Sequence, residues 1–221
     1  GQVPEHWDTA PLKHLCELLK DGTHLPPPRV DSGIPLLSVR NIINNKFTFR
    51  DDDSQISESS YADLCKSFIP KNGDVVLAIV GATIGKVALI EKMENFHIQR
   101  SLGIFRTRKT KLNNYFLAYI FGSKGFQSLL WENAGFSAQP GIYLGALSNF
   151  LIPVPSKKKQ KSIIDFIEIQ LVNFDNLINK ALHSVQLMQE RRTVLISAAV
   201  TGKIDVRNWQ NPTEAKMEFS A

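Results

Sequence analysis

The chain has 221 residues, 43% of them hydrophobic, and a formal net charge of +5 at pH 7. This length suits one globular unit with an elongated appendage, and no run reaches the roughly 20 apolar residues that span a bilayer, which argues for a soluble protein. Residues 1–7 lack the basic start and apolar stretch of a secretory signal, so we expect a cytoplasmic location without membrane contact.

Three short apolar runs in the first half of the chain predict β-strands. The first follows the turn sequence Asn72-Gly73-Asp74, and the second follows two glycines. The predicted strands cover residues 75–80, 86–90 and 101–105. Helical segments lie between and after them, so we expect an α+β fold with a globular mixed α/β domain.

Two short helices have clear start signals. Ser57 is a favourable N-terminal cap for a helix over residues 58–66. Asn113 is a similar cap for a helix over residues 114–121, which Gly122 then ends.

A boundary is predicted near residue 155. Residues 152–155 read Ile-Pro-Val-Pro, and proline disfavours helix at the residue before it, so the backbone is extended there. The expected organisation is a globular domain over residues 1–155, a long helix over residues 156–207 and a C-terminal tail over residues 208–221.

From residue 156 the sequence follows one helical period, in which apolar residues alternate steps of three and four like the a and d positions of a coiled coil. This seam consists of Ile164, Ile167, Leu171, Phe174, Ile178, Ala181, Val185 and Met188. No Pro or Gly interrupts residues 156–201, so the helix would be about 65 Å long before Gly202 ends it. A domain of about 150 residues, with a radius of gyration of about 15 Å, cannot bury such a stripe. We therefore expect docking to a second helix rather than simple core packing.

Basic residues concentrate in two places. One is a patch within residues 86–124, which hold eight Lys or Arg against two acidic residues. Its core is formed by Arg100, Arg106, Arg108, Lys109 and Lys111. Such a patch neutralises phosphates in nucleic-acid-binding proteins, and a solvated surface is the alternative. Residues 157–159 are three lysines at the positive end of the long helix, where they face a phosphate backbone or an acidic partner, or form a solvated charge run.

Residues that carry catalytic or metal chemistry are not arranged for it. Residues 81–86 lack the spacing of a phosphate-binding Walker loop and predict a tight turn between strands, with Lys86 at its tip. The five histidines have no metal-ligand spacing, and Cys16 and Cys65 are expected to be buried structural thiols rather than metal or redox sites. Residues 51–53 are three aspartates expected to form an exposed loop. We expect a non-catalytic protein with no cofactor and no metal.

Several motifs together resemble one family. They are Val3-Pro4-Glu5-His6-Trp7, Asp21-Gly22-Thr23-His24, Gly33-Ile34-Pro35 leading to Ser38-Val39-Arg40-Asn41-Ile42, Gly73-Asp74-Val75-Val76, the turn at residues 81–86, Ser137-Ala138-Gln139-Pro140 and the ending RRTVLISAAVTGKIDVR at residues 191–207. The sequence thereby resembles the specificity subunit of Type I restriction-modification systems over residues 3–207. The final motif is the most specific of these, and the glycine turn alone would be weak.

The resemblance implies a target recognition domain that reads a few base pairs of double-stranded DNA. It also implies that the long helix packs antiparallel with a second helix as a spacer and binds methyltransferase subunits, with the restriction subunit joining through the complex. S-adenosylmethionine, ATP and magnesium would belong to those other chains. The family usually has two recognition domains and two helices in one chain, so a C-terminal half, an engineered fragment and a self-pairing half-subunit all stay open. Lys159-Gln160 stands where the family often has Glu-Gln, which affects the expected partner contacts there.

For DNA contact we expect polar side chains on loops of the recognition domain. Arg, Asn and Gln pair with base edges, whereas Lys86 suits a phosphate. The candidates are Thr23, His24, Arg40, Asn41, Lys86, Gln99, Arg100, Gln139 and Tyr143. For each of them a turn-stabilising or merely exposed role is the alternative.

Two rival functions remain from sequence alone. A coiled-coil scaffold would share the helix but would not bind DNA specifically, and a self-contained enzyme would need a catalytic cluster that the sequence does not display. We expect the isolated chain to dimerise through the helix.

Overall fold

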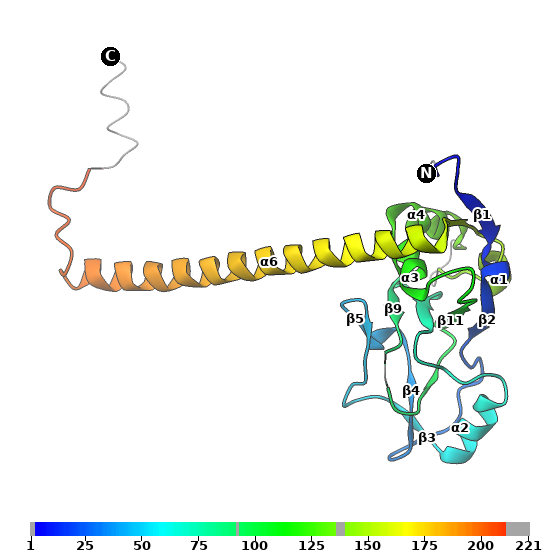
Figure 1. Cartoon of the computed structure of the whole chain (residues 1–221). Helices are drawn as coiled ribbons and strands as arrows, with labels where there is room; N and C mark the ends of the chain where they lie inside the picture. Colours follow the sequence, from blue (N-terminus) through cyan, green and yellow to red (C-terminus); the bar gives the residue numbers. More distant parts are fainter. Residues whose placement is uncertain (1–2, 92, 136–139, 211–221) are drawn as a thin grey trace. The chain divides into compact units, whose positions relative to one another are not determined.

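The computed structural model describes residues 3–91, 93–135 and 140–210 (Figure 1). It divides into two compact units, Gly1–Asp165 and Phe166–Ala221. The first is a mixed α/β domain that also contains the start of the long helix α6 (Lys157–Val200), and the rest of α6 lies in the second. This agrees with the expected α+β class and the long C-terminal helix. No helix in the described part of the chain is long and apolar enough to span a membrane.

A six-stranded sheet organises the domain. All its neighbours are antiparallel except β6 and β9, which pair in parallel. In spatial order the strands are β2 (Cys16–Asp21), β11 (Leu102–Thr107), β8 (Val75–Ala78), β9 (Val87–Leu89), β6 (Lys46–Phe47) and β5 (Ile42–Ile43).

Two smaller sheets complete the strands. A four-stranded sheet has the order β10 (His97–Ile98), β4 (Ile34–Leu37), β7 (Gln55–Ile56) and β3 (Arg29–Val30). A two-stranded sheet pairs β1 (Asp8–Pro11) antiparallel with β12 (Leu151–Val154). The prolines of residues 152–155 thus do force an extended segment, which pairs with the start of the domain. The shorter helices are α1 (Leu12–Leu15), η1 (Val39–Asn41), α2 (Glu58–Cys65), α3 (Asn114–Gly122), α4 (Lys124–Asn133) and α5 (Leu144–Leu147).

The centre of the six-stranded sheet is buried on both faces. Along β8, Val75 and Leu77 join a cluster with Phe116 of α3, whereas Val76 and Ala78 join a second cluster with Leu37 and other residues on the opposite face. All four β8 residues have 0% of their surface exposed, which explains why the sequence reads as a continuous apolar run rather than an alternating one.

The predicted short elements are confirmed with small shifts of their ends. Strands β8, β9 and β11 correspond to the three apolar runs. The Ser57 side chain accepts a hydrogen bond from the Ser60 N–H at the start of α2, and the Asn113 side chain accepts one from the Tyr115 N–H at the start of α3. The segment after Gly122 was not predicted as a helix, yet Ser123 caps α4 directly.

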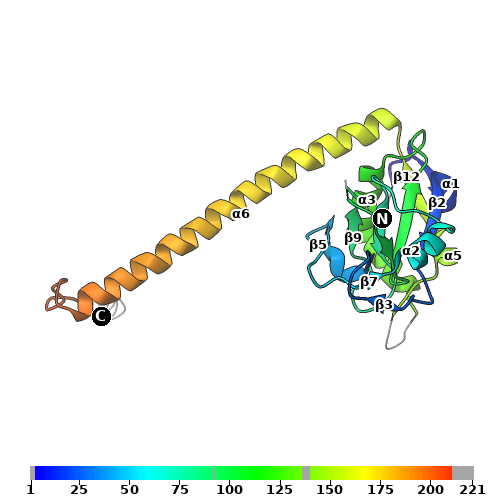
Figure 2. The ribbon, with the colours of Figure 1, turned by 90° about the horizontal axis from the view of Figure 1, so that it is seen from below.

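Helix α6 has 44 residues without interruption, about 66 Å at 1.5 Å per residue (Figure 2). It ends at Val200, and the predicted stop Gly202 follows two residues later with a φ of 71°, in the left-handed region. The Lys203 N–H donates to the Ala198 carbonyl at 2.9 Å and the Gly202 N–H to the Ala199 carbonyl at 3.2 Å, the pair of bonds that closes a Schellman motif. Pairing of α6 with a second helix stays a proposal.

Gln160 fixes the first turns of α6 to the domain. Its side chain is fully buried, and its Oε1 accepts the Asn113 N–H at 2.8 Å. Its Nε2 donates to the carbonyls of Lys111 and Pro155, each at 2.9 Å. This glutamine, which the sequence associated with partner contact, therefore joins α6 to the α3 cap and to the β12 exit within the same domain.

Replacing Gln160 with alanine should destabilise the domain by about 1–3 kcal/mol, because it leaves the Asn113 N–H and two carbonyls without a partner in a buried site. Gln160→Glu should cost at least as much, since a carboxylate oxygen would then face the Lys111 and Pro155 carbonyls. Gln189→Ala, on an exposed turn of the same helix, is the matched control and should change little. Chemical denaturation followed by circular dichroism measures the difference, and equal midpoints for Gln160→Ala and the control would contradict this role.

Candidate nucleic-acid interface

Most of the predicted DNA-contacting residues meet at one end of the six-stranded sheet. We call it the Gln99 end. Here β2 ends, β11 begins and the β8–β9 turn lies, because Gly103 pairs with Asp21 and Leu102 pairs with Ala78. Residues 140–143 join it through backbone bonds to residues 79–81. Loops far apart in sequence are thereby placed on a common scaffold, as binding loops commonly are.

Thr23, Gln99 and Arg100 are held together by backbone pairing. Thr23 and Gln99 form a parallel bridge, and the Arg100 N–H donates to the Thr23 carbonyl at 3.2 Å. The Gln99 amide donates to the Leu36 carbonyl at 3.3 Å, and among the described residues its second N–H group and its carbonyl oxygen have no further side-chain hydrogen bond. The Arg100 side chain is exposed and has no ion pair within the described part of the chain. Arg100 is thus an exposed cation at this end that no described acidic side chain neutralises.

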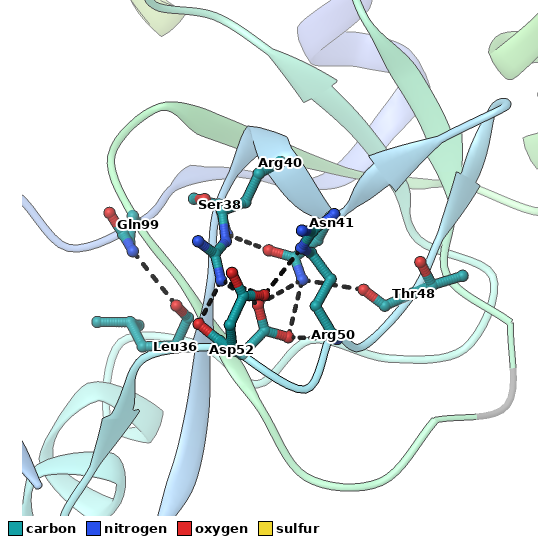
Figure 3. Close-up of polar contacts among 9 residues, drawn as sticks. Leu36, Ser38, Arg40, Asn41, Thr48, Arg50, Asp52 and Gln99 are labelled. Carbon is teal, nitrogen blue, oxygen red and sulfur yellow. Dashed lines mark hydrogen bonds and ion pairs between the residues drawn. The ribbon is translucent and has the colours of Figure 1, made fainter. Parts of the chain in front are cut away.

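Arg40 and Asn41 lie beside Gln99, because η1 follows β4 and β4 pairs with β10 (Figure 3). Their side chains serve the local fold. Asn41 is fully buried. Its Oδ1 accepts the Ser38 N–H, and its Nδ2 donates to the Thr48 carbonyl and the Asp53 carboxylate, each at 2.9 Å. A side chain enclosed in this way has no free donor for a base. Asn41 therefore positions the loop, which is the turn-stabilising role given above as the alternative to DNA contact.

Arg40 is bound by acidic neighbours but stays half exposed. Its guanidinium pairs with the Asp52 carboxylate at 2.8 Å and also donates to the Asp52 carbonyl. Arg50 binds the same carboxylate at 3.1 Å, and the two arginines hold the pKa of Asp52 below its usual value, chiefly through the Arg50 hydrogen bond. The expected exposed aspartate loop is thus tied to its neighbours by arginines. To contact DNA, the Arg40 guanidinium would have to break its ion pair with Asp52 or keep it while also binding the DNA.

Of the other described candidates, His24, Lys86 and Tyr143 are exposed and Thr23 is half-buried. His24 forms a 2.7 Å contact with Asp21, and the Tyr143 side chain is 88% exposed. Lys86 is exposed, but its carbonyl accepts from the Ala78 N–H, so it flanks β9 instead of occupying the tip of the turn as predicted. Gln139 lies outside the described residues. Leu25, next to the candidate pair Thr23 and His24, is 87% exposed and was not among the predicted contacts. The three prolines that follow it, residues 26–28, indicate an exposed loop and could have identified it.

The basic patch predicted around residues 100–111 is divided by strand β11. Arg100 lies at the Gln99 end, whereas Arg106, Arg108 and Lys109 lie at or beyond the other end of the strand. Arg106 is not a free cation: it binds the buried Asp74 carboxylate through two 2.8 Å hydrogen bonds and donates to the Ile69 carbonyl. The bonds to Asp74 raise the pKa of Arg106 above its usual value. The cations of this patch are therefore divided between the two ends of β11 and do not form one cluster.

The cysteines are unpaired. Cys16 is buried, and burial raises the pKa of its thiol to about 12, which keeps the thiol neutral. Cys65 is only partly buried, so the expectation of two buried thiols is wrong for that residue. In the described residues no group of three His, Cys, Asp or Glu side chains is arranged to hold a metal ion.

Comparison with proteins of known sequence gives long matches at modest identity. The chain is 26% identical over 212 residues to the specificity subunit of the Type I restriction enzyme MjaVIII from Methanocaldococcus jannaschii, covering 94% of this chain and 48% of the relative. It is 22% identical over 231 residues to the EcoKI specificity subunit of Escherichia coli, covering 96% of this chain and 46% of the relative. The chain spans about half the length of these curated relatives.

Solved structures share the fold. The HsdS subunit from Thermoanaerobacter tengcongensis matches with a TM-score of 0.61 at 14% identity, over 96% of this chain and 53% of that chain. The S subunit of a Type I restriction-modification system from M. genitalium matches with a TM-score of 0.53 at 16% identity, over 80% of this chain and 43% of that chain. Residues 4–186 match the family described as the Type I restriction modification DNA specificity domain. With most of its length matched, the chain belongs to this family, as its sequence motifs indicated.

Proposed function

We propose that this chain is the sequence-specific DNA-binding part of a Type I restriction-modification complex and reads one half of a bipartite target. The observation that carries the proposal is the convergence of Thr23, Gln99, Arg100 and Tyr143 at one end of a rigid sheet. Arg and Gln side chains discriminate base edges, and an exposed tyrosine adds a stacking or hydrogen-bonding surface. Catalysis of methylation and cleavage then belongs to other chains.

Helix α6 has the second role in the proposal, which is docking of protein partners. Large apolar side chains along its seam are exposed, among them Leu171 at 46%, Phe174 at 57% and Ile178 at 55%. Exposed apolar stripes of this kind mark surfaces that are buried in an assembly. We propose that the seam pairs antiparallel with a second helix and that the paired helices bind methyltransferase subunits, through which the restriction subunit joins.

A coiled-coil scaffold without specific DNA binding is the second candidate, because the exposed seam alone would suit it. Selection of bound duplexes from a random-sequence pool separates the two. A recurring short motif among the selected duplexes supports recognition, whereas recovery of random sequence at every round leaves only the scaffold.

Arg100→Ala should weaken or relax specific binding by about 1–3 kcal/mol, the usual value of one good contact between an arginine and a base. Gln139→Ala should act in the same direction. Neither change should lower the melting temperature appreciably, because the Arg100 side chain is exposed and makes no ion pair among the described residues. Titration of the selected duplex and of single-base variants measures both affinity and preference.

Arg108→Ala is the matched control for Arg100→Ala. Both arginines flank strand β11 and both are exposed, but Arg108 lies past the end remote from Gln99. Its loss should leave the base preference unchanged. Unaltered affinity and preference in Arg100→Ala would contradict the assignment of this end as the reading surface.

A further inference from the structure

A polar hollow lies at the end of the six-stranded sheet opposite the Gln99 end. Its volume is about 660 Å³, and its lining includes Lys71, Asp74, Arg106, Lys109 and Lys157. The strand register fixes this position, because Phe105 pairs with Val75 and Thr107 pairs with Cys16. We call it the Lys71 hollow.

The Lys71 hollow has an excess of unpaired positive charge. Four cations and two carboxylates line it, the carboxylates being Asp74 and Glu17. The charge of Asp74 is neutralised by Arg106, which donates a hydrogen bond to each of its carboxylate oxygens. Within the described part of the chain Lys71, Lys109 and Lys157 have no ion pair, and partial burial lowers the pKa of Lys157. Three lysines and one unpaired carboxylate, Glu17, thus remain to attract an anion.

The anion at this place is better supplied by a protein than by the DNA read at the Gln99 end. Strand β11 separates the two places by six residues, about 17–20 Å at 3.3 Å per residue. Side chains that reach base edges at one end direct the duplex to that end. The hollow instead adjoins the first turn of α6. The first seam residue, Ile164, is buried in the domain core, and the seam reaches the surface from Ile167, ten residues and about 15 Å beyond Lys157.

We propose that the Lys71 hollow binds an acidic segment of the methyltransferase subunit, whose carboxylates pair with Lys71, Lys109 and Lys157. The inference rests on the proposed docking role of α6 and adds a second, polar contact next to the apolar seam. Lysine suits it because its ammonium is a flexible point charge that accepts carboxylates in several geometries. Such charge pairs give an interface its orientation and speed its formation, which an apolar seam alone cannot do. Lys157, the first of the three lysines at residues 157–159, thereby gains an acidic partner at the start of α6.

The test uses the full chain with Lys71, Lys109 and Lys157 all changed to alanine, and the immobilised methyltransferase subunit of the same restriction-modification system as the probe. The alanine variant should bind that subunit about tenfold or more weakly at low salt, with the difference shrinking as salt rises. The same three positions changed to arginine should keep binding. A second control, Lys46, Lys66 and Lys124 changed to alanine, removes the same charge from exposed positions outside α6 and should have a small effect.

A parallel titration of duplex DNA separates the two possible anions. The alanine variant should bind the selected duplex with unchanged affinity and salt dependence. If the logarithmic salt slope for DNA instead falls by about 0.9 for each lysine removed, the hollow binds phosphates and the inference is overturned. Equal methyltransferase binding by the alanine variant and the second control also overturns it. An unmodified chain that does not bind the methyltransferase subunit overturns the docking role in the proposed function and this inference with it.

Discussion

Aspartate at Leu171 and Ile178 is expected to abolish self-association of the isolated chain. Both side chains belong to the seam of α6 and are 46% and 55% exposed, so a monomer leaves them in water. Pairing of two helices would bury them, and an unpaired carboxylate in that interface would cost several kcal/mol for each residue. Because an antiparallel pair presents each position twice, the double variant places four charges in the seam. Sedimentation of the unmodified chain should give a dimer, and sedimentation of the variant a monomer.

The matched control places the same charge off the seam. Asn173→Asp and Asn176→Asp introduce two aspartates on other faces of the same helical turns, and both positions are exposed. This variant should remain dimeric and should have the helical content of the unmodified chain. An unmodified chain that is already monomeric at high concentration would mean that the seam is reserved for a different subunit.

The elements that could be predicted from sequence are those that depend on local chemistry. Caps at Ser57 and Asn113 act within three residues, and the seam of α6 repeats within one helix. The apolar run at residues 75–80 was recognised as a strand because it is buried on both faces of the sheet. In each case the determining contacts, or the composition they impose, lie within a few residues of one another.

The details that could not be predicted depend on long-range pairing. Arg106 belongs to a basic stretch in the sequence, but the fold places it against Asp74, which is 32 residues away. Asn41 is a residue type that commonly contacts bases. Only the folded structure shows that its amide N–H groups already donate to the Thr48 carbonyl and the Asp53 carboxylate. Strand β11 separates cations that are neighbours in sequence. Composition therefore indicated where basic residues are concentrated, but it could not say which cations are free.

Removal of one heptad from α6, residues 175–181, should bring the two half-sites of the recognised DNA about three base pairs closer. If two chains pair about a two-fold axis, each presents the same recognition domain, so the selected site is two inverted copies of one half-site. The helix sets the distance between the domains, and seven residues shorten it by about 10 Å at 1.5 Å per residue. At about 3.4 Å per base pair this equals about three base pairs. The half-site sequences should stay the same, because the Gln99 end is untouched.

A whole heptad is required because it keeps the a and d positions of the remaining seam in register, from Phe174 on one side of the deletion to Val185 on the other. Duplication of residues 175–181 is the converse variant and should widen the gap by the same amount. Duplex selection from a random pool, performed in parallel on the three proteins, measures the gap and the half-sites together. In a two-domain subunit the same logic gives an asymmetric bipartite site, of which this chain specifies one half. A continuous asymmetric site for the isolated chain, or a gap that ignores helix length in both directions, would refute the role of α6 as the spacer.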